Sequence, residues 1–372
     1  MLRVMIVAGA QCEPSLVTPV SYPYYGPMSS PRPLRMPPAP VQHFYRGGDR
    51  IARLRGAKVV SDHQPEEWLA STTHRFGEPG TGLSRTEDGA LLQDLVAADP
   101  KGWVGTSDAG VGDVGVLVKL LDARQRLPVH VHPDRPFATS HLGCPYGKTE
   151  AWFVLEAEPG CAFYVGWQHP VDRAELDRRR DAQDGQWMLD NMNRIEARPG
   201  MGVIVPAGTV HAIDGGIFVA EVQEPTDFSI LLEWSVTTST REESDLDLGF
   251  DAAMSAVSTG ALGADRLATI ITRAGAAGPT VSPVLASVAD PFFRLRQTTA
   301  TSSARTDTVE AGFGVVLVTE GIGQLVGASE DIPVERGEVY AMPYGFGGWH
   351  VEGDAAILVA SSVIGWPAGV AA

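Results

Sequence analysis

The chain has 372 residues, enough for two domains of ordinary size, and its 44% hydrophobic and 20% charged residues are typical of a soluble protein with sizeable cores. With 29 lysines and arginines against 45 aspartates and glutamates, the net charge is −16. A field of this sign repels phosphate and disfavours nonspecific binding to nucleic acid or anionic membranes. We therefore expect neither as a partner.

The start of the chain differs in amino-acid composition from the rest. A short apolar stretch with one arginine is at the lower limit for a secretory signal and is followed by no clear cleavage site. The next residues, Pro14 to Pro40, are crowded with proline, serine and tyrosine. We expect residues 1–38 to be a poorly ordered leader or an over-extended start, with Met28 or Met36 as alternative starts.

The cysteines bear on the compartment. Cys12, Cys144 and Cys161 lie far apart and form no CxxC pair. A sparse, odd set favours a reducing compartment over a disulfide framework, so we predict a cytoplasmic protein.

From about residue 41 the sequence is β-rich. Short apolar runs separated by turn residues predict an antiparallel sandwich or barrel. The charged stretch Asp172–Asn193 predicts a surface helix, with Asp172 or Asp184 as its N-cap. Residues 246–276 carry apolar residues at helical spacing and are expected to join two β-rich units.

The two β-rich units share a spacing. In the first unit, Gly200, Pro206 and Gly208 form G-x5-P-x-G, and a histidine follows at position 211, three residues after the second glycine. In the second unit the pattern runs from Gly337 to Gly345, and His350 follows five residues after that glycine. The pattern indicates a repeated strand–turn–strand unit. The alternative is that these glycines and prolines only mark turns, as in any β protein. The spacing alone does not decide between a repeat and such turns.

The strongest local signal is the sequence Val-His-Val-His-Pro at 129–133. Residues i and i+2 of a strand face the same side, so His130 and His132 would project together. Glu150 and His211 follow in the order that completes a mononuclear metal site with open positions. An isolated pair of this kind is more often two surface histidines, but the ordered carboxylate and third imidazole favour the metal site.

These motifs resemble a known family. HxH, then Glu, then G-x5-P-x-G-x2-H is similar to the two-part cupin motif, and VLVKLLDARQRLPVHVHPD, GKTEAWFVLE and VIVPAGTVHAIDGGIFVAEVQEPTD resemble blocks of the class I mannose-6-phosphate isomerases. QPEEWLAS resembles the N-terminal block of that family. The gap of seventeen residues between His132 and Glu150 also resembles the family, in which such an insertion is typical.

The resemblance implies a mainly β fold of two cupin (jelly-roll) barrels with a small helical insertion or linker. We expect a metal-binding cupin domain at 39–236, a helical linker at 237–282 and a C-terminal cupin domain without a metal site at 283–372.

Two positions depart from the family pattern. The family usually has Gln-x-His where this chain has His130-x-His132, and histidine is an equally competent ligand. The family also places an Arg four residues after the Asp that corresponds to Asp227, and this chain has Leu231 there. The missing cation puts a phosphorylated substrate in question.

The resemblance also suggests roles for single residues. Zinc (Zn2+), or Fe2+ or Mn2+ in its place, would be held by the four ligands named above. Lys148, in the family's Lys-x-Glu pattern, is a candidate proton carrier, and Asp227 and Glu224 are further catalytic candidates. Trp68, Ser71 and Arg46 are substrate-binding candidates. A tryptophan is more often a core residue, and Arg46 is proposed only because its residue type could replace the missing cation.

The expected function is the interconversion of mannose 6-phosphate and fructose 6-phosphate through an enediol. An isomerase of a different or unphosphorylated sugar, a cupin Fe/Mn dioxygenase and a non-catalytic sugar-binding cupin are the alternatives. The expected partner is a small sugar or sugar phosphate, and the sequence does not decide the oligomeric state.

Overall fold

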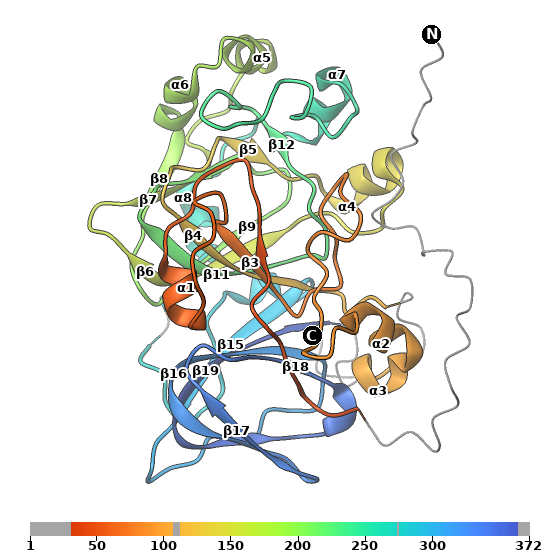
Figure 1. The fold of residues 1–372 in the computed structure, drawn as a ribbon. Coiled ribbons are helices and arrows are strands. Elements are labelled where there is room, and N and C mark those ends of the chain that lie inside the picture. Colours follow the sequence, from red (N-terminus) through yellow and green to blue (C-terminus); the bar gives the residue numbers. More distant parts are fainter. Residues whose placement is uncertain (1–30, 107–111, 274, 364–372) are drawn as a thin grey trace.

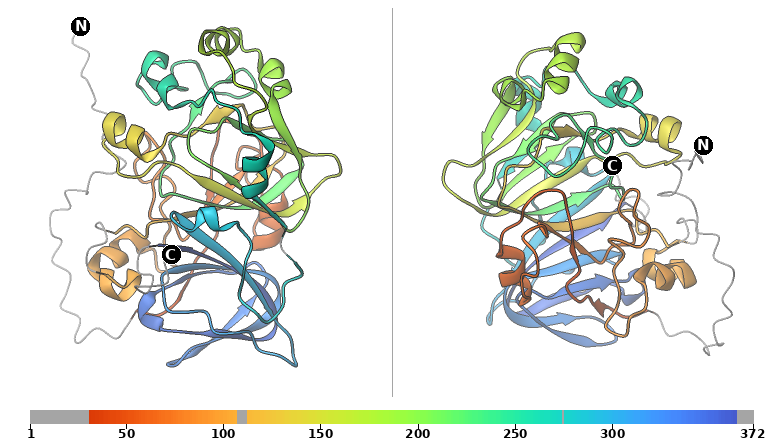
Figure 2. Two further views of the ribbon diagram at one scale, coloured as in Figure 1. Left: turned by 180° about the vertical axis from the view of Figure 1, so that it is seen from behind. Right: turned by 45° about the horizontal axis from the view of Figure 1, so that its top comes forward.

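The computed structural model describes residues 31–106, 112–273 and 275–363, and these fold mainly into three antiparallel β-sheets (Figure 1). Two sheets built from residues 40–273 lie together, and the sheet that holds the C-terminal strands lies below them in Figure 1 and in the reverse view of Figure 2. The predicted mainly β fold is confirmed, whereas its division into two barrels stays a prediction.

The first sheet has seven strands in the order β13-β9-β6-β11-β4-β3-β2. Its central strands are the apolar runs of the sequence, and almost every residue in them is buried, as expected for strands covered on both faces. The strands are β2 (Pro40–Val41), β3 (Glu66–Leu69), β4 (Leu117–Ala123), β6 (Glu150–Ala157), β9 (Met201–Val205), β11 (Ile217–Gln223) and β13 (Ile271–Arg273).

The second sheet has five short strands in the order β12-β5-β10-β7-β8. Its register aligns His211 with His130 on one side of β5 and Leu231 with His130 on the other. Directly opposed residues of antiparallel strands face the same side, so these three side chains share one face. The strands are β5 (His130–Val131), β7 (Ala162–Trp167), β8 (Met192–Glu196), β10 (His211–Ile213) and β12 (Ile230–Leu231).

The third sheet contains the C-terminal strands and one strand from the start of the chain. Residues Leu34–Arg35 form β1, which pairs with β18, and Met36 is buried beside them. Residues 31–38 of the predicted leader are therefore part of this fold, and residues 1–30 lie outside the described residues. The strands are β1, β14 (Ser282–Pro283), β15 (Phe293–Ala300), β16 (Gly314–Val326), β17 (Asp331–Glu335), β18 (Val339–Met342) and β19 (His350–Ser362).

One apolar core joins the first and third sheets. Phe153 and Val222 of the first sheet belong to the same buried cluster as Phe293 and Leu358 of the third. The two predicted β-rich units thus bury their surfaces against each other.

The predicted surface helix is two helices, α5 (Arg173–Asp181) and α6 (Gly185–Asp190). Both predicted caps are confirmed: the Asp172 carboxylate accepts from the Glu175 amide at 2.9 Å, and the Asp184 carboxylate accepts from the Trp187 amide at 3.1 Å. The remaining α-helices are α1 (Arg50–Arg55), α2 (Leu92–Ala98), α3 (Pro100–Val104), α4 (Arg135–Phe137), α7 (Phe250–Ala253) and α8 (Ala264–Thr269).

The predicted helical linker is helical only in part. Residues 237–282 contain α7, one 3₁₀ turn (Met254–Ala256) and α8, and the chain then adds β13 to the first sheet. Gly260 and Gly263 separate the two helices, and glycine weakens a helix through its backbone entropy. Within the described ranges, every helix is too short or too polar to cross a bilayer.

The repeated G-x5-P-x-G pattern marks similar turns at its first glycine. Gly200 (φ 79°) and Gly337 (φ 90°) both adopt the left-handed conformation shortly before a strand, which favours glycine. The second glycines differ, because Gly208 is left-handed (φ 81°) whereas Gly345 lies in a 3₁₀ turn. The likeness between the two units is therefore local.

Candidate active site

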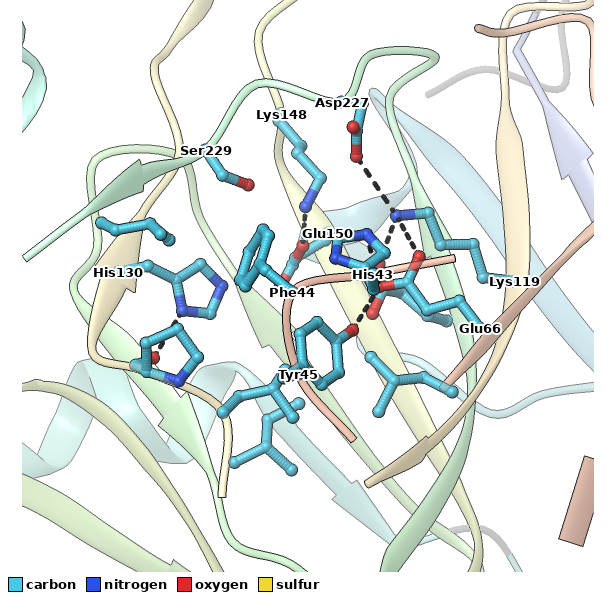
Figure 3. Close-up of a pocket in the computed structure, with 16 residues that line it drawn as sticks. His43, Phe44, Tyr45, Glu66, Lys119, His130, Lys148, Glu150, Asp227 and Ser229 are labelled. Carbon is cyan, nitrogen blue, oxygen red and sulfur yellow. Dashed lines mark hydrogen bonds and ion pairs between the residues drawn. The ribbon is translucent and has the colours of Figure 1, made fainter. Parts of the chain in front are cut away.

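A polar pocket, partly open to solvent, lies between the first two sheets (Figure 3). Its walls come from strands β3, β4, β5, β6, β10, β11 and β12 and from the segment that precedes α1. The lining residues are His43, Phe44, Tyr45, Glu66, Lys119, Leu121, Leu127, Pro128, His130, Lys148, Glu150, Ile213, Glu221, Asp227, Ser229 and Leu231.

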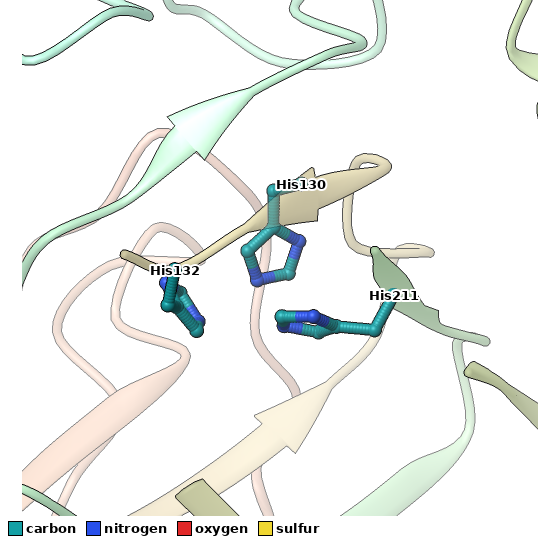
Figure 4. A group of neighbouring side chains, drawn as sticks. All are labelled: His130, His132 and His211. Carbon is teal, nitrogen blue, oxygen red and sulfur yellow. The ribbon is translucent and has the colours of Figure 1, made fainter. Parts of the chain in front are cut away.

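Three buried imidazoles converge at one end of this pocket. His130, His132 and His211 each offer a ring nitrogen, and these three nitrogens lie within 4.8 Å of one another (Figure 4). The centroids of the His130 and His211 rings are 4.0 Å apart, as their opposed positions on β5 and β10 require. The predicted pairing of the HxH motif with the third histidine is thus present in the fold.

Each imidazole is oriented by the main chain. The Nδ1 atom of each ring lies 2.7–2.8 Å from a carbonyl oxygen, those of Pro128, Phe228 and Thr209 for His130, His132 and His211 in turn. A carbonyl accepts only, so each Nδ1 carries a proton, and Nε2 is the ring nitrogen that faces the other imidazoles. Burial lowers the pKa of His132 to about 3 and that of His130 well below its ordinary value, which keeps both rings neutral.

Glu150 and Lys148 complete this end of the pocket. The Glu150 carboxylate lies 3.0 Å from His132 Nε2 and 3.3 Å from His211 Nε2, and Lys148 Nζ donates to it at 2.8 Å. Burial alone would raise the pKa of Glu150, but the positive charge of Lys148 holds it well below its usual range.

The donor set fits a divalent metal. His211 Nε2 is buried with no hydrogen-bond partner, although it faces a carboxylate and two other imidazoles. A buried acceptor without a partner costs about 1–3 kcal/mol. Three imidazoles oriented by carbonyl groups, with one carboxylate beside them, are an arrangement in which a metal ion would bind the inward-facing ring nitrogens.

A second charged cluster lies across the pocket around Lys119. Its ammonium is 3.2 Å from Glu66, 3.7 Å from Glu221 and 3.7 Å from Asp227. Lys119 and Glu221 face each other directly on β4 and β11. Sequence reasoning missed this cluster, although a charged residue inside each of two otherwise apolar strands was a usable signal.

The Lys119 cluster contains groups with shifted pKa values. Burial, followed by the charge of Glu150, raises the pKa of Glu221 to about 8, so its carboxyl is mostly protonated at neutral pH. Burial disfavours the charged form of Lys119, but Glu66, Glu221 and Asp227 together raise its pKa above the ordinary lysine value. The cluster thus pairs a fixed cation with a carboxyl that can exchange a proton near neutral pH.

The other predicted site residues divide between pocket and surroundings. Asp227 lines the pocket. Glu224 lies outside the lining: its carboxylate accepts from Arg135 Nε at 2.6 Å and from the Thr149 amide at 2.9 Å, which fixes the backbone between Lys148 and Glu150.

The predicted substrate-binding residues also lie outside the lining. Trp68 is buried behind it, with Nε1 donating to Glu66 at 2.8 Å and the Lys119 ammonium 4.7 Å from its ring. Ser71 is buried and donates to the Thr73 carbonyl at 3.0 Å. Arg46 is exposed, with Asp62 at 3.6 Å.

Leu231 lines the pocket from β12, next to His130. The position where the family has an arginine therefore faces the site in this chain, and an aliphatic side chain occupies it.

No protein-family model matches this chain. Among solved structures, the mannose 6-phosphate isomerase of Bacillus subtilis matches with a TM-score of 0.69 and 20% identity, over 89% of this chain and 99% of that one. The apo form of the Salmonella typhimurium enzyme matches with a TM-score of 0.65 and 14% identity, over 90% and 100%. These likenesses show that the chain has the fold of these enzymes, and its inward-facing imidazoles form a site that could bind a metal.

Proteins of similar sequence indicate more closely which enzymes this chain resembles. The mannose-6-phosphate isomerase of Streptococcus mutans is 26% identical over 326 residues, which cover 85% of this chain and 94% of that protein. A mannose-6-phosphate isomerase of Bacillus subtilis is 26% identical over 246 residues, or 66% of this chain and 74% of that protein. The chain is therefore similar over most of its length to proteins named mannose-6-phosphate isomerase, the likeness that its motifs indicated.

Proposed function

We propose that this chain is a metal-dependent aldose–ketose isomerase that converts mannose 6-phosphate to fructose 6-phosphate. The observation that carries the proposal is the convergence of three buried imidazoles and Glu150 beside Lys148 in one pocket. The names of the relatives supply mannose 6-phosphate as the substrate, and fructose 6-phosphate is the ketose that an aldose–ketose isomerisation would form from it.

His130, His132, His211 and Glu150 would hold the metal, which we take to be zinc, since three nitrogens and a carboxylate suit that ion. Bound there, a divalent ion supplies Lewis-acid polarisation of a carbonyl oxygen.

Isomerisation moves a proton between two neighbouring carbons through an enediol, and it needs a group that takes up and returns that proton. Lys148 is the proposed carrier, because its ammonium lies in the pocket 2.8 Å from both Glu150 and His132 Nε2. Glu221 is a second candidate, since a carboxyl with a pKa of about 8 can exchange a proton near neutral pH.

An unphosphorylated sugar is the second candidate substrate, and the charges of the pocket favour it. Lys119 and Lys148 are the cations among the described lining residues other than histidine, and both already contact carboxylates. Leu231 stands where a guanidinium would otherwise face the site. A dianionic phosphate would therefore enter a pocket whose positive charges are compensated.

The test is a comparison of mannose 6-phosphate and mannose as substrates of the zinc-loaded protein, with a chelated sample as control. Zinc-dependent formation of fructose 6-phosphate supports the proposal, and turnover of mannose alone supports the second substrate. Leu231→Arg should then shift preference toward the phosphorylated sugar, while Leu231→Met controls for packing at this buried position. Absence of turnover with either sugar, in folded and metal-loaded protein, would contradict the isomerase.

A further inference from the structure

The ring of His43 is buried in the pocket with neither nitrogen hydrogen-bonded. Its side chain is only 8% exposed, and both Nδ1 and Nε2 lack a hydrogen-bond partner. Figure 3 shows the ring among the pocket residues, on the same side as Glu66 and Lys119. Its closest charged neighbour is the Glu66 carboxylate, 3.5 Å from Nε2, and this contact lacks hydrogen-bond geometry.

The fold holds this ring in place from both sides. The His43 amide donates to the His63 carbonyl at 2.8 Å, and the His43 carbonyl lies 3.1 Å from His63 Nδ1. The rings of Phe44 and Tyr45 flank the imidazole at centroid distances of 4.8 Å each. The Tyr45 hydroxyl in turn donates to Glu66, so the segment is fixed at the pocket wall.

A buried imidazole without hydrogen-bond partners lowers the free energy of unfolding. Buried polar groups are nearly always hydrogen-bonded, and each one left without a partner costs about 1–3 kcal/mol. A phenylalanine at this position would pack equally well and would avoid that cost. The arrangement is therefore expected where a bound molecule supplies the missing hydrogen bonds.

The chemistry of the ring points to the group that it would bind. Burial lowers the pKa of His43, so the ring is neutral and presents one donor and one acceptor. A hydroxyl group also both donates and accepts, whereas a phosphate dianion only accepts and favours cations.

We propose that His43 is a substrate-binding residue that hydrogen-bonds a hydroxyl group of a polyhydroxylated substrate in this pocket. The inference rests on the proposed function, because it takes a sugar to be the occupant. His43 would add a substrate-binding residue on the side of the pocket that holds the Lys119 cluster. The hydroxylated chain of the substrate would then lie along that side.

The test is the affinity of zinc-loaded protein for mannose 6-phosphate and for mannose, measured by titration calorimetry on wild type and variants. His43→Phe removes both nitrogens and keeps a ring, His43→Gln keeps one donor and one acceptor, and His350→Phe makes the same change on the third sheet. We expect about tenfold weaker binding in His43→Phe. Binding in His43→Gln should stay within about threefold of wild type, and that in His350→Phe should be unchanged.

Turnover and metal content separate this role from a structural one. His43→Phe should bind the same amount of zinc and raise KM more than it lowers kcat, because a hydroxyl contact is made in both ground and transition states. If that variant does not fold, His43→Leu provides the same comparison.

Three outcomes would overturn the inference. If wild type and His43→Phe bind a sugar with equal affinity, and wild type converts that sugar, then His43 is not a substrate-binding residue. The proposed isomerase function would be unaffected by that result. Binding in His43→Gln as weak as in His43→Phe would show that ring shape matters and not the hydrogen bonds. A wild type that neither binds nor converts either sugar would remove the inference and the proposed function together.

Discussion

Replacing Lys119 by methionine should destabilise the fold, because it leaves the carboxylates of Glu66 and Asp227 in one buried pocket without their shared cation. The side chains of Lys119, Glu66 and Glu221 are 2–5% exposed, so water screens their interactions poorly. Methionine has a similar length and packs well, which confines the perturbation to the charge.

The magnitude follows from the distances. At an effective dielectric constant of about 20, the Lys119–Glu66 pair at 3.2 Å contributes about 5 kcal/mol of attraction, and the Lys119–Asp227 pair at 3.7 Å contributes slightly less. Glu221 is mostly protonated at neutral pH and adds little. Protonation and rehydration of the remaining carboxylates reduce the net loss to about 3–5 kcal/mol, as for other buried pairs that lose one partner. For 372 residues at about 2.1 cal/mol/K each, this loss lowers Tm by about 4–6 °C.

The loss should also depend on pH. The pKa of Lys119 is raised in the folded state, so its stabilising contribution is fully present below the ordinary lysine pKa and is lost only above it. In the variant, carboxylates without their cation take up protons as pH falls. The difference between variant and wild type should therefore grow from pH 5 to pH 8.

The assay is denaturant unfolding of chelated protein, which removes any contribution from bound metal. Lys101→Met, at an exposed position in α3, is the matched control and should change stability by less than about 0.5 kcal/mol. Adding Glu66→Gln to Lys119→Met should recover part of the loss. A Lys119→Met loss below about 1 kcal/mol, equal at pH 5 and pH 8, would refute this account of the cluster.

Three further predictions concern the imidazole end of the pocket. His211→Ala should lose bound zinc and all metal-dependent activity while its circular dichroism stays that of a β protein; retained zinc by elemental analysis would contradict the ligand set. Lys148→Ala should keep its zinc and lose about 10²–10⁴-fold in kcat, and normal turnover would exclude it as proton carrier. The pKa of His132 is lowered to about 3, so the metal-free protein should lose stability as pH falls below about 6.5, where only the unfolded chain binds the proton. His132→Asn should flatten this slope between about pH 6.5 and pH 4, and an unchanged slope would contradict it.

Much of the imidazole site could be predicted because its order in the chain reflects simple strand geometry. Alternation along a strand brings His130 and His132 together, and the turn at Gly208 returns the chain to place His211 beside them. The caps at Asp172 and Asp184 were equally local and needed only a short polar side chain before each helix.

The rest of the pocket depends on register and long-range packing. Lys119 and Glu221 are 102 positions apart and meet only because β4 and β11 pair in one particular register. Nothing local distinguishes His43 from a surface histidine, since its burial comes from Phe44, Tyr45 and the pairing with His63. Glu224 follows its strand as predicted, but the amide of Thr149 and the guanidinium of Arg135 hold its carboxylate outside the pocket lining.

Titrating zinc into metal-free protein while following conversion of mannose 6-phosphate and of mannose tests whether the chain is a metal-dependent isomerase. We expect no turnover without metal, a rise in proportion to added zinc up to one equivalent per chain, and no rise in His211→Ala. Full turnover in protein verified as metal-free, or none in folded protein that holds one zinc per chain, would contradict it.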